Sequence, residues 1–189
     1  TGTYSIPSPE DVLRAVSAMD SPCEICFFGG SFTCFPPGRQ KQYLETVFAA
    51  PSGSTVRFST HPECISRTVL KETGQYPVSM IELGISSLDD RVLKVCNRGY
   101  SGEEALASLR TVLDEGFHAG AQMMIGLPGQ ARESSLQDLR RINEIRKGRP
   151  VTLRIYPCLV LDKTPLAELC REGKYTPLSV NGAAIWAGE

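Results

Sequence analysis

Two glycines and a serine follow a short apolar run near the start of the sequence, within residues 26–35 (CFFGGSFTCF). A glycine lets the backbone approach a ligand closely and leaves its N–H and C=O groups unshielded. Gly29, Gly30 and Ser31 are therefore candidates for binding a polar ligand. Taken alone, two such glycines more often form a simple turn, and both interpretations stay open at this point.

The cysteines do not form an obvious metal site. Cys23 and Cys26 have the CxxC spacing of a metal-binding pair, but residues three apart in a strand point to opposite faces, and no second pair occurs. The total of seven is odd, and the cysteines are scattered through apolar segments. We therefore expect reduced thiols, most of them small core residues, rather than metal ligands or a disulfide framework.

Two further side chains are candidates for chemistry. Arg98, between Asn97 and Gly99, has the donor geometry to bind a carboxylate, although an ordinary surface arginine is the commoner interpretation. His61 is one of only two histidines, and the other, His118, lies at the start of a predicted strand. The histidines are therefore not expected to form a cluster.

The elements that position these residues alternate between strands and helices. Apolar runs predict strands at residues 23–28, 55–58, 78–85, 119–127 and 151–160, which begin about 30 residues apart. Helical patterns lie between them, with predicted caps at Ser8, Ser87, Ser101, Ser134 and Thr164. The alternation indicates an α/β fold with a parallel sheet, either doubly wound or a (β/α) barrel. Both folds place their ligands at the C-terminal ends of the strands.

The composition is that of an ordinary globular domain. The 189 residues are 41% hydrophobic and 22% charged, and the net charge is −1, so nothing global favours nucleic acid as a partner. No apolar run reaches the roughly 18 residues of a membrane span, and the first residues lack the character of a signal peptide. We expect a cytoplasmic protein with no membrane partner.

Several motifs are more specific in combination than alone. In chain order they are FFGGSFT (27–33), STHP (59–62), IELGISSLDD (81–90), NRG (97–99), QMMIGLPG (122–129) and RIYP (154–157). The series closely resembles the radical S-adenosylmethionine (SAM) superfamily, in the branch of the elongator catalytic subunit and its bacterial relatives. Oxygen-independent coproporphyrinogen III oxidase is a more distant relative. The expected core is residues 1–180, and residues 181–189 are a tail that starts a further helix.

The resemblance implies a fold and a reaction. The fold is a partial (β/α)6 barrel of parallel strands, whose first strand and cluster-binding loop are expected before Thr1. In the family, three cysteines of a CxxxCxxC loop hold a [4Fe–4S] cluster, and SAM binds the remaining iron. An external electron donor drives cleavage of SAM to a 5′-deoxyadenosyl radical, which abstracts hydrogen from a substrate. The substrate is not specified, and tRNA follows from analogy only. The alternative is a non-catalytic barrel remnant that binds a small molecule or RNA.

The resemblance also implies roles by position. Gly29, Gly30 and Ser31 match the motif that holds the amino group of SAM, and Arg98 matches the arginine that binds its carboxylate. The remaining implied contacts lie on the adenosyl side of SAM. Gln122 matches a polar contact with the ribose, Ser59 lies at another strand end that faces the adenosyl group, and the segment that begins with Ile125 and Gly126 would pack against the adenine. Glu82 is expected to point into the barrel, and no catalytic residue is assigned.

The sequence departs from the family pattern in three places. It contains no CxxxCxxC motif, so the cluster cysteines are expected before Thr1. His61 stands where an arginine is common in this branch, and Ser86 stands where a glutamine is usual. Both replacements fall where contacts with SAM or substrate are expected.

Overall fold

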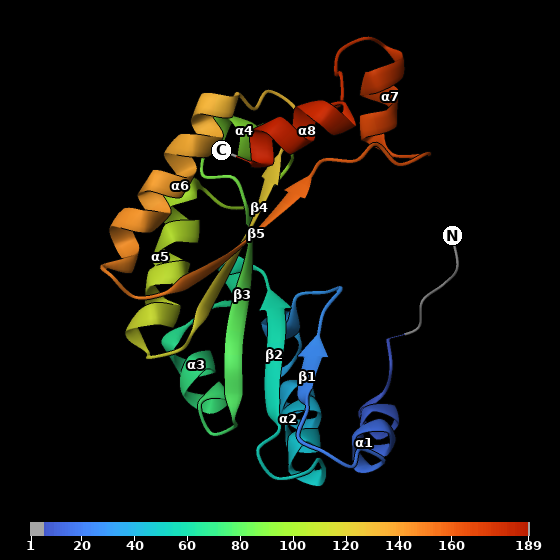
Figure 1. Ribbon diagram of the computed structural model, residues 1–189, viewed down its shortest axis with the longest axis vertical. Coiled ribbons are helices and arrows are strands. Elements are labelled where there is room, and N and C mark those ends of the chain that lie inside the picture. The colour runs from blue at the N-terminus through green and yellow to red at the C-terminus, as the bar shows by residue number, and fades with distance from the viewer. Residues whose placement is uncertain (1–5, 189) are drawn as a thin grey trace.

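A computed structural model describes residues 6–188, in which five strands form one parallel sheet (Figure 1). The strands are β1 Glu24–Phe27, β2 Thr55–Thr60, β3 Val78–Ser86, β4 Ala119–Ile125 and β5 Val151–Pro157. Their order in the sheet is their order along the chain. The α/β fold is confirmed, and the sequential order is that of a partial barrel, because a doubly wound sheet reverses its strand order. The further strand expected before Thr1 lies outside the described residues.

Helices follow or precede each strand. They are α1 Pro9–Ser17, α2 Pro37–Glu45, α3 Arg67–Thr73, α4 Asp90–Val95, α5 Gly102–Asp114, α6 Arg132–Arg146, α7 Pro165–Arg171 and α8 Val180–Ala187. Single 3₁₀ turns occur at Phe32–Cys34, Thr46–Ala49 and Pro62–Cys64. The tail expected to start a further helix is almost entirely α8. None of the helices within residues 6–188 is long and apolar enough to cross a membrane.

The predicted helix caps are only partly right. Ser8 and Ser101 both form capping boxes, and Thr164 caps α7. Ser134 does not cap α6, because the helix already begins after Ala131, and its hydroxyl instead donates to the Ala131 carbonyl. Ser87 does not cap α4 either, since the side chain of Asp89 accepts the first free N–H of that helix. In both helices, a neighbouring residue in extended conformation sets the start.

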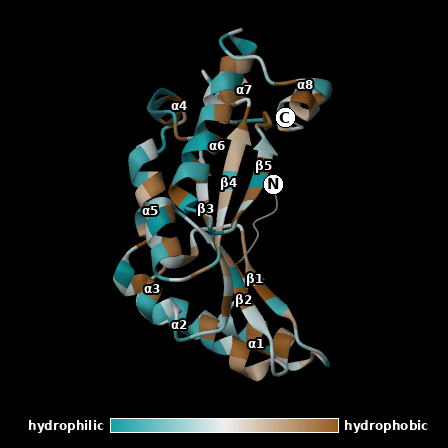
Figure 2. Cartoon of the chain, turned by 60° about the vertical axis from the view of Figure 1, so that its left-hand side comes forward, coloured by the Kyte–Doolittle hydropathy of each residue, from teal (hydrophilic) through white to brown (hydrophobic). Residues whose placement is uncertain are grey.

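One face of the sheet is covered by helices and forms the core. The buried side chains that meet there include Ile81, Leu83 and Ile85 of β3, Ala119 and Ala121 of β4, and Leu106, Leu109 and Val112 of α5. Figure 2 shows α3, α5 and α6 along this side of the strands. Each large apolar side chain buried in this layer contributes about 1.5–3 kcal/mol to folding. We call the opposite side of the sheet the open face.

Phe48, Leu13 and Met19 recur in the sequence at the spacing of a buried helical face, which predicts that they are buried, but all three are exposed. Phe48 is 67% exposed and lies against the ring of Tyr76, because the chain changes from α-helix to 3₁₀-helix at Thr46 and the side-chain spacing changes with it. Leu13 and Met19 are also exposed, and only Val16 of α1 is buried. The helical stripe of α1 is therefore narrower than the sequence predicts.

Candidate functional site

On the open face, each of the five strands carries at least one polar or charged side chain. Alternation along the strands places Cys26, Arg57, Glu82, Gln122 and Arg154 on this face, opposite the buried residues of the core. The strand register sets their neighbours: Cys26 pairs with Arg57, and Gln122 pairs with Arg154. Charged side chains therefore converge from strands far apart in the sequence.

Gly29 and Gly30 lie where β1 ends, beside a hollow in the surface. Gly29 has φ +89°, a conformation that favours glycine, and a methyl group built on either glycine would meet no atom within 4 Å. The hollow has a volume of about 600 Å³, and both glycines line it. Packing does not require glycine here, so the exposed backbone is available to a ligand. Ser31, the next predicted contact, is half-buried and precedes the 3₁₀ turn Phe32–Cys34.

Arg98 lies at the C-terminal end of β3. Its guanidinium donates to the hydroxyl of Ser86, a residue with φ 64°. Among residues 6–188, no carboxylate lies within ion-pair distance of Arg98, whereas Arg57 and Arg154 both pair with Glu82. Ser86 is thus a neutral partner that, among the described residues, leaves the charge of Arg98 uncompensated.

His61 lies near Arg98. Its ring contacts the ring of Tyr100 with centroids 4.9 Å apart, and its Nδ1 lies 3.2 Å from Oε2 of Glu63. Burial lowers the pKa of His61 below its ordinary value, although the Glu63 carboxylate acts in the opposite direction. The imidazole is therefore neutral at pH 7 and adds no second positive charge beside Arg98.

Ser59 and Gln122 meet around Glu82 on the open face. Ser59 is the register partner of Glu82 in the neighbouring strand, and Gln122 Nε2 donates to Glu82 Oε2 over 2.8 Å. Arg57 Nε donates to Oε1 over 2.5 Å, and Arg154 Nη1 donates to Oε2 over 2.9 Å. The expectation that Glu82 points to the inner side of the barrel agrees with these contacts.

The network connects to the glycine turn through Phe28. The guanidinium carbons of Arg57 and Arg154 lie 5.8 and 5.2 Å from the centre of the Phe28 ring. Phe28 immediately precedes Gly29, so the turn and the network border one surface. Sequence reasoning missed Arg57 and Arg154 as members of this site. The sequence did contain a signal for them, because each is a single charged residue between apolar residues of a predicted strand, in VRF (56–58) and LRI (153–155).

Ile125 and Gly126 lie at the end of β4 and are covered by the chain that follows β5. Ile125 is buried, and a methyl group on Gly126 would come within 2.8 Å of Leu178. The hydroxyl of Tyr175 donates to the Gly126 carbonyl over 2.6 Å. A contact of these two residues with adenine stays a prediction, and residues 175–178 would border it.

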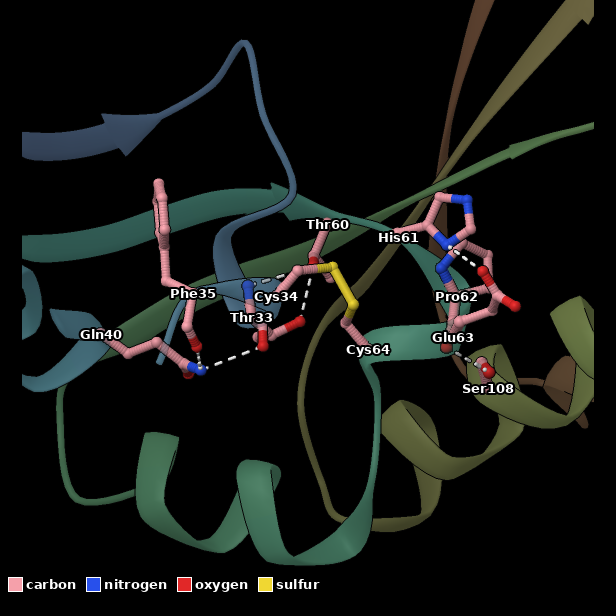
Figure 3. The surroundings of a disulfide bond; sticks show 10 residues. All are labelled: Thr33, Cys34, Phe35, Gln40, Thr60, His61, Pro62, Glu63, Cys64 and Ser108. Carbon is pink, nitrogen blue, oxygen red and sulfur yellow. Dashed lines mark hydrogen bonds and ion pairs between the residues drawn. A yellow bond between two sulfur atoms is a disulfide. The ribbon is translucent and has the colours of Figure 1, made fainter. Parts of the chain in front are cut away.

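The cysteines differ from the sequence prediction. Cys34 and Cys64 form a disulfide between the turns that follow β1 and β2, with Cα atoms 5.2 Å apart (Figure 3). The prediction of reduced thiols is therefore wrong for this pair, since the pairing of β1 with β2 brings the two turns together. Cys26 is exposed on the open face, so its assignment to the core is wrong as well.

No metal site appears among the residues that the structure describes. Cys23 packs against the core while Cys26 faces the other side, so the two do not act together as a metal-binding pair. Within residues 6–188, no three cysteine, histidine or carboxylate side chains come together in a way that would hold a metal. These residues therefore do not fit an iron–sulfur cluster by themselves.

Comparisons with known proteins identify the family of this chain. The sequence model of the Radical SAM superfamily matches residues 1–142. The tRNA uridine(34) acetyltransferase of Methanocaldococcus infernus is 29% identical over 118 residues, which cover 62% of this chain and 22% of that protein. Elongator complex protein 3 of Homo sapiens is 27% identical over 176 residues, covering 82% of this chain and 32% of that protein.

Solved structures show the same fold. The archaeal Elp3 of Methanocaldococcus infernus superposes with a TM-score of 0.76 at 24% identity, over 93% of this chain and 46% of that chain. Coproporphyrinogen III oxidase (HemN) from Escherichia coli superposes with a TM-score of 0.69 at 16% identity, over 95% and 42% of the two chains. At these identities the likeness is one of fold. The chain spans between about a fifth and a half of the length of these relatives.

Proposed function

The chain belongs to the radical SAM superfamily, and on this basis we propose that it forms the SAM-binding part of a radical SAM enzyme. The observation that carries the proposal is the turn at Gly29 and Gly30. Its backbone faces a hollow of about 600 Å³ at the C-terminal end of a barrel strand, where this fold binds ligands. The backbone groups of the turn can bind the polar amino-acid part of SAM.

Each residue has a chemical task in this proposal. The backbone of Gly29 and Gly30, together with Ser31, accepts hydrogen bonds from the amino group. Arg98 pairs with the carboxylate of SAM. Its charge is available for this pairing because no carboxylate within residues 6–188 compensates it. On the adenosyl side, Gln122 binds the ribose, Ser59 faces the adenosyl group from the end of β2, and Ile125 and Gly126 border the adenine.

A reduced [4Fe–4S] cluster beside the bound SAM would supply the radical chemistry of the family, in which hydrogen is abstracted from a substrate. The cluster cysteines and the electron donor are placed outside residues 6–188, whose own task is to bind and orient SAM. The relatives named for tRNA uridine modification make tRNA the candidate substrate by analogy, while the net charge of −1 gives it no electrostatic support.

A pair of ligands tests the role of Arg98. S-adenosylhomocysteine has the amino-acid part of SAM, and 5′-methylthioadenosine lacks it. Using the protein expressed from its complete gene, we expect Arg98→Gln to weaken binding of S-adenosylhomocysteine at least tenfold, because a charge-assisted hydrogen bond is worth about 1.5–3 kcal/mol. Binding of 5′-methylthioadenosine should change little. Arg67→Gln is the control, since Arg67 is 72% exposed and pairs with Glu115.

Catalysis is tested separately, after anaerobic reconstitution of the same protein with iron and sulfide. A radical SAM enzyme should gain the visible absorption of a cluster and release 5′-deoxyadenosine from SAM when a low-potential reductant is added. Binding without cleavage would favour the non-catalytic barrel instead. Failure to bind either nucleoside would overturn the proposal.

A further inference from the structure

Glu82 is a fully buried carboxylate in the middle of β3. Its side chain is 0% exposed and accepts hydrogen bonds from Arg57, Gln122 and Arg154, which come from three other strands. Burial raises the pKa of Glu82, but the hydrogen bonds from Arg154, Gln122 and Arg57 outweigh it and hold the pKa below its ordinary value. Glu82 is therefore an ionised acceptor at neutral pH.

Gly120 of β4 provides the space in which this carboxylate lies. Gly120 is the register partner of Glu82, and a methyl group built on it would come within 2.7 Å of Glu82 Cγ. Its φ does not lie in the left-handed region, so backbone conformation does not require glycine here. What requires glycine at this position is the Glu82 side chain, which reaches across β4 to Arg154 of β5.

The contact with Glu82 decides which way the Gln122 amide faces. An ionised carboxylate can only accept hydrogen bonds, so the NH₂ group of Gln122 must point to Glu82. The amide oxygen then points away from Glu82 and is free to accept a hydrogen bond. Without the carboxylate, the amide is able to rotate and offer either its oxygen or its NH₂ group to a ligand.

From this arrangement we propose that Glu82 and Gly120 are positioning residues that fix Gln122 as a hydrogen-bond acceptor for a ribose hydroxyl. The inference rests on the proposed function, because the ribose is that of SAM. The fixed orientation of the Gln122 amide would explain how the protein distinguishes ribose from deoxyribose. A ligand hydroxyl donates to the fixed amide oxygen, and a deoxy analogue leaves that oxygen without a donor.

The test measures discrimination rather than activity. Dissociation constants of S-adenosylhomocysteine and of its 2′-deoxy and 3′-deoxy analogues are determined with the protein expressed from its complete gene. The unmodified protein should bind one deoxy analogue about 5- to 10-fold more weakly, the factor expected for one neutral hydrogen bond. Glu82→Gln should reduce this ratio to about 2-fold or less, because its own amide permits Gln122 to rotate.

Two further variants make the test specific. Gly120→Ala keeps every charged group but displaces the Glu82 side chain, so it should lower the same ratio, and it answers the question if Glu82→Gln does not fold. Glu24→Gln is the matched control. Glu24 lies on the same face and contacts Arg57 and Ser79, not Gln122, so the ratio should stay unchanged.

A second readout needs no ligand. The side-chain NH₂ protons of Gln122 should exchange slowly and give a distinct NMR signal in the unmodified protein, and both properties should be lost in Glu82→Gln. Binding of S-adenosylhomocysteine with no preference for either hydroxyl would overturn this inference and leave the proposed function standing. An unchanged ratio in Glu82→Gln and Gly120→Ala would overturn it too. Absence of binding by the unmodified protein would instead contradict the proposed function.

Discussion

The hydroxyl oxygens of Thr33 and Thr60 lie 2.5 Å apart in the interior, and the backbone N–H of Thr33 donates to the same Thr60 oxygen over 3.1 Å. Together they join the turn that follows β1 to the end of β2. The disulfide between Cys34, which follows Thr33, and Cys64, in the turn after β2, joins the same part of the chain (Figure 3). The turn that carries Gly29 and Gly30 is thus anchored to its neighbour by both polar and covalent contacts.

Removal of the disulfide should lower stability without unfolding the protein. Cys34→Ser with Cys64→Ser opens a covalent loop across 30 residues, which should lower the free energy of unfolding by about 3–4 kcal/mol. The threonine pair should keep the turns together. Urea denaturation checks this, with Cys170→Ser as the control, since Cys170 is a free cysteine.

The same experiment in the presence of a dithiol reductant separates the disulfide from the substitutions. Reductant should lower the stability of the unmodified protein and leave the double variant unchanged. Thiol titration of the denatured protein should find two additional thiols after reduction. An equal thiol count before and after reduction would show that the pair is not oxidised.

Gly29→Ala should affect both stability and ligand binding. At φ +89° an alanine is strained by about 1–2 kcal/mol, and its methyl group would project into the hollow. We expect binding of S-adenosylhomocysteine to weaken at least tenfold, measured by calorimetric titration. Gly53→Ala has the same strain at φ +92°, but Gly53 does not line that hollow, so it should lose stability and keep its affinity. Equal affinities in the two variants would contradict a role for the turn.

His61 should make the protein less stable as the pH falls. Its pKa in the folded state lies below 6.5 because of burial, so the unfolded state binds the proton first. Stability attributable to His61 is therefore present above about pH 6.5 and is lost as the pH falls through that value. Unfolding free energies at pH 7.5 and 5.5 should differ less in His61→Gln than in the unmodified protein.

Glu63 supplies the complementary check for His61. Its carboxylate raises the pKa of His61, so Glu63→Gln should move the NMR titration of the His61 ring to still lower pH. A His61 titration at or above its ordinary pKa would rule out this account.

Local signals in the sequence were sufficient to locate the elements. All five strands and the capping boxes at Ser8 and Ser101 depend on residues near one another in the chain. The predicted start of α6 was wrong because serine is a common N-cap residue, which favoured Ser134. The helix begins after Ala131 instead, and nothing in the sequence indicates the extended conformation of that residue. Phe48 fits the helical period of its segment but is exposed, because the apolar spacing does not reveal that the chain changes to 3₁₀ geometry at Thr46.

The contacts that organise the site depend on register, which the sequence does not state. Glu82 accepts hydrogen bonds from Arg57, which is 25 residues away along the chain, and from Arg154, which is 72 residues away. Cys34 and Cys64 meet only because β1 and β2 pair in parallel. The odd number and scattered positions of the seven cysteines therefore led to the wrong expectation for this pair.

The sequential strand order has a consequence for how the chain folds. Each of β2 to β5 pairs with the strand made just before it, so every new strand meets a partner that has already been synthesised. Contacts between strands close loops of about one βα unit, which keeps the entropy lost on loop closure small. The molecule is therefore suited to fold progressively during translation, adding one strand and its helix at a time.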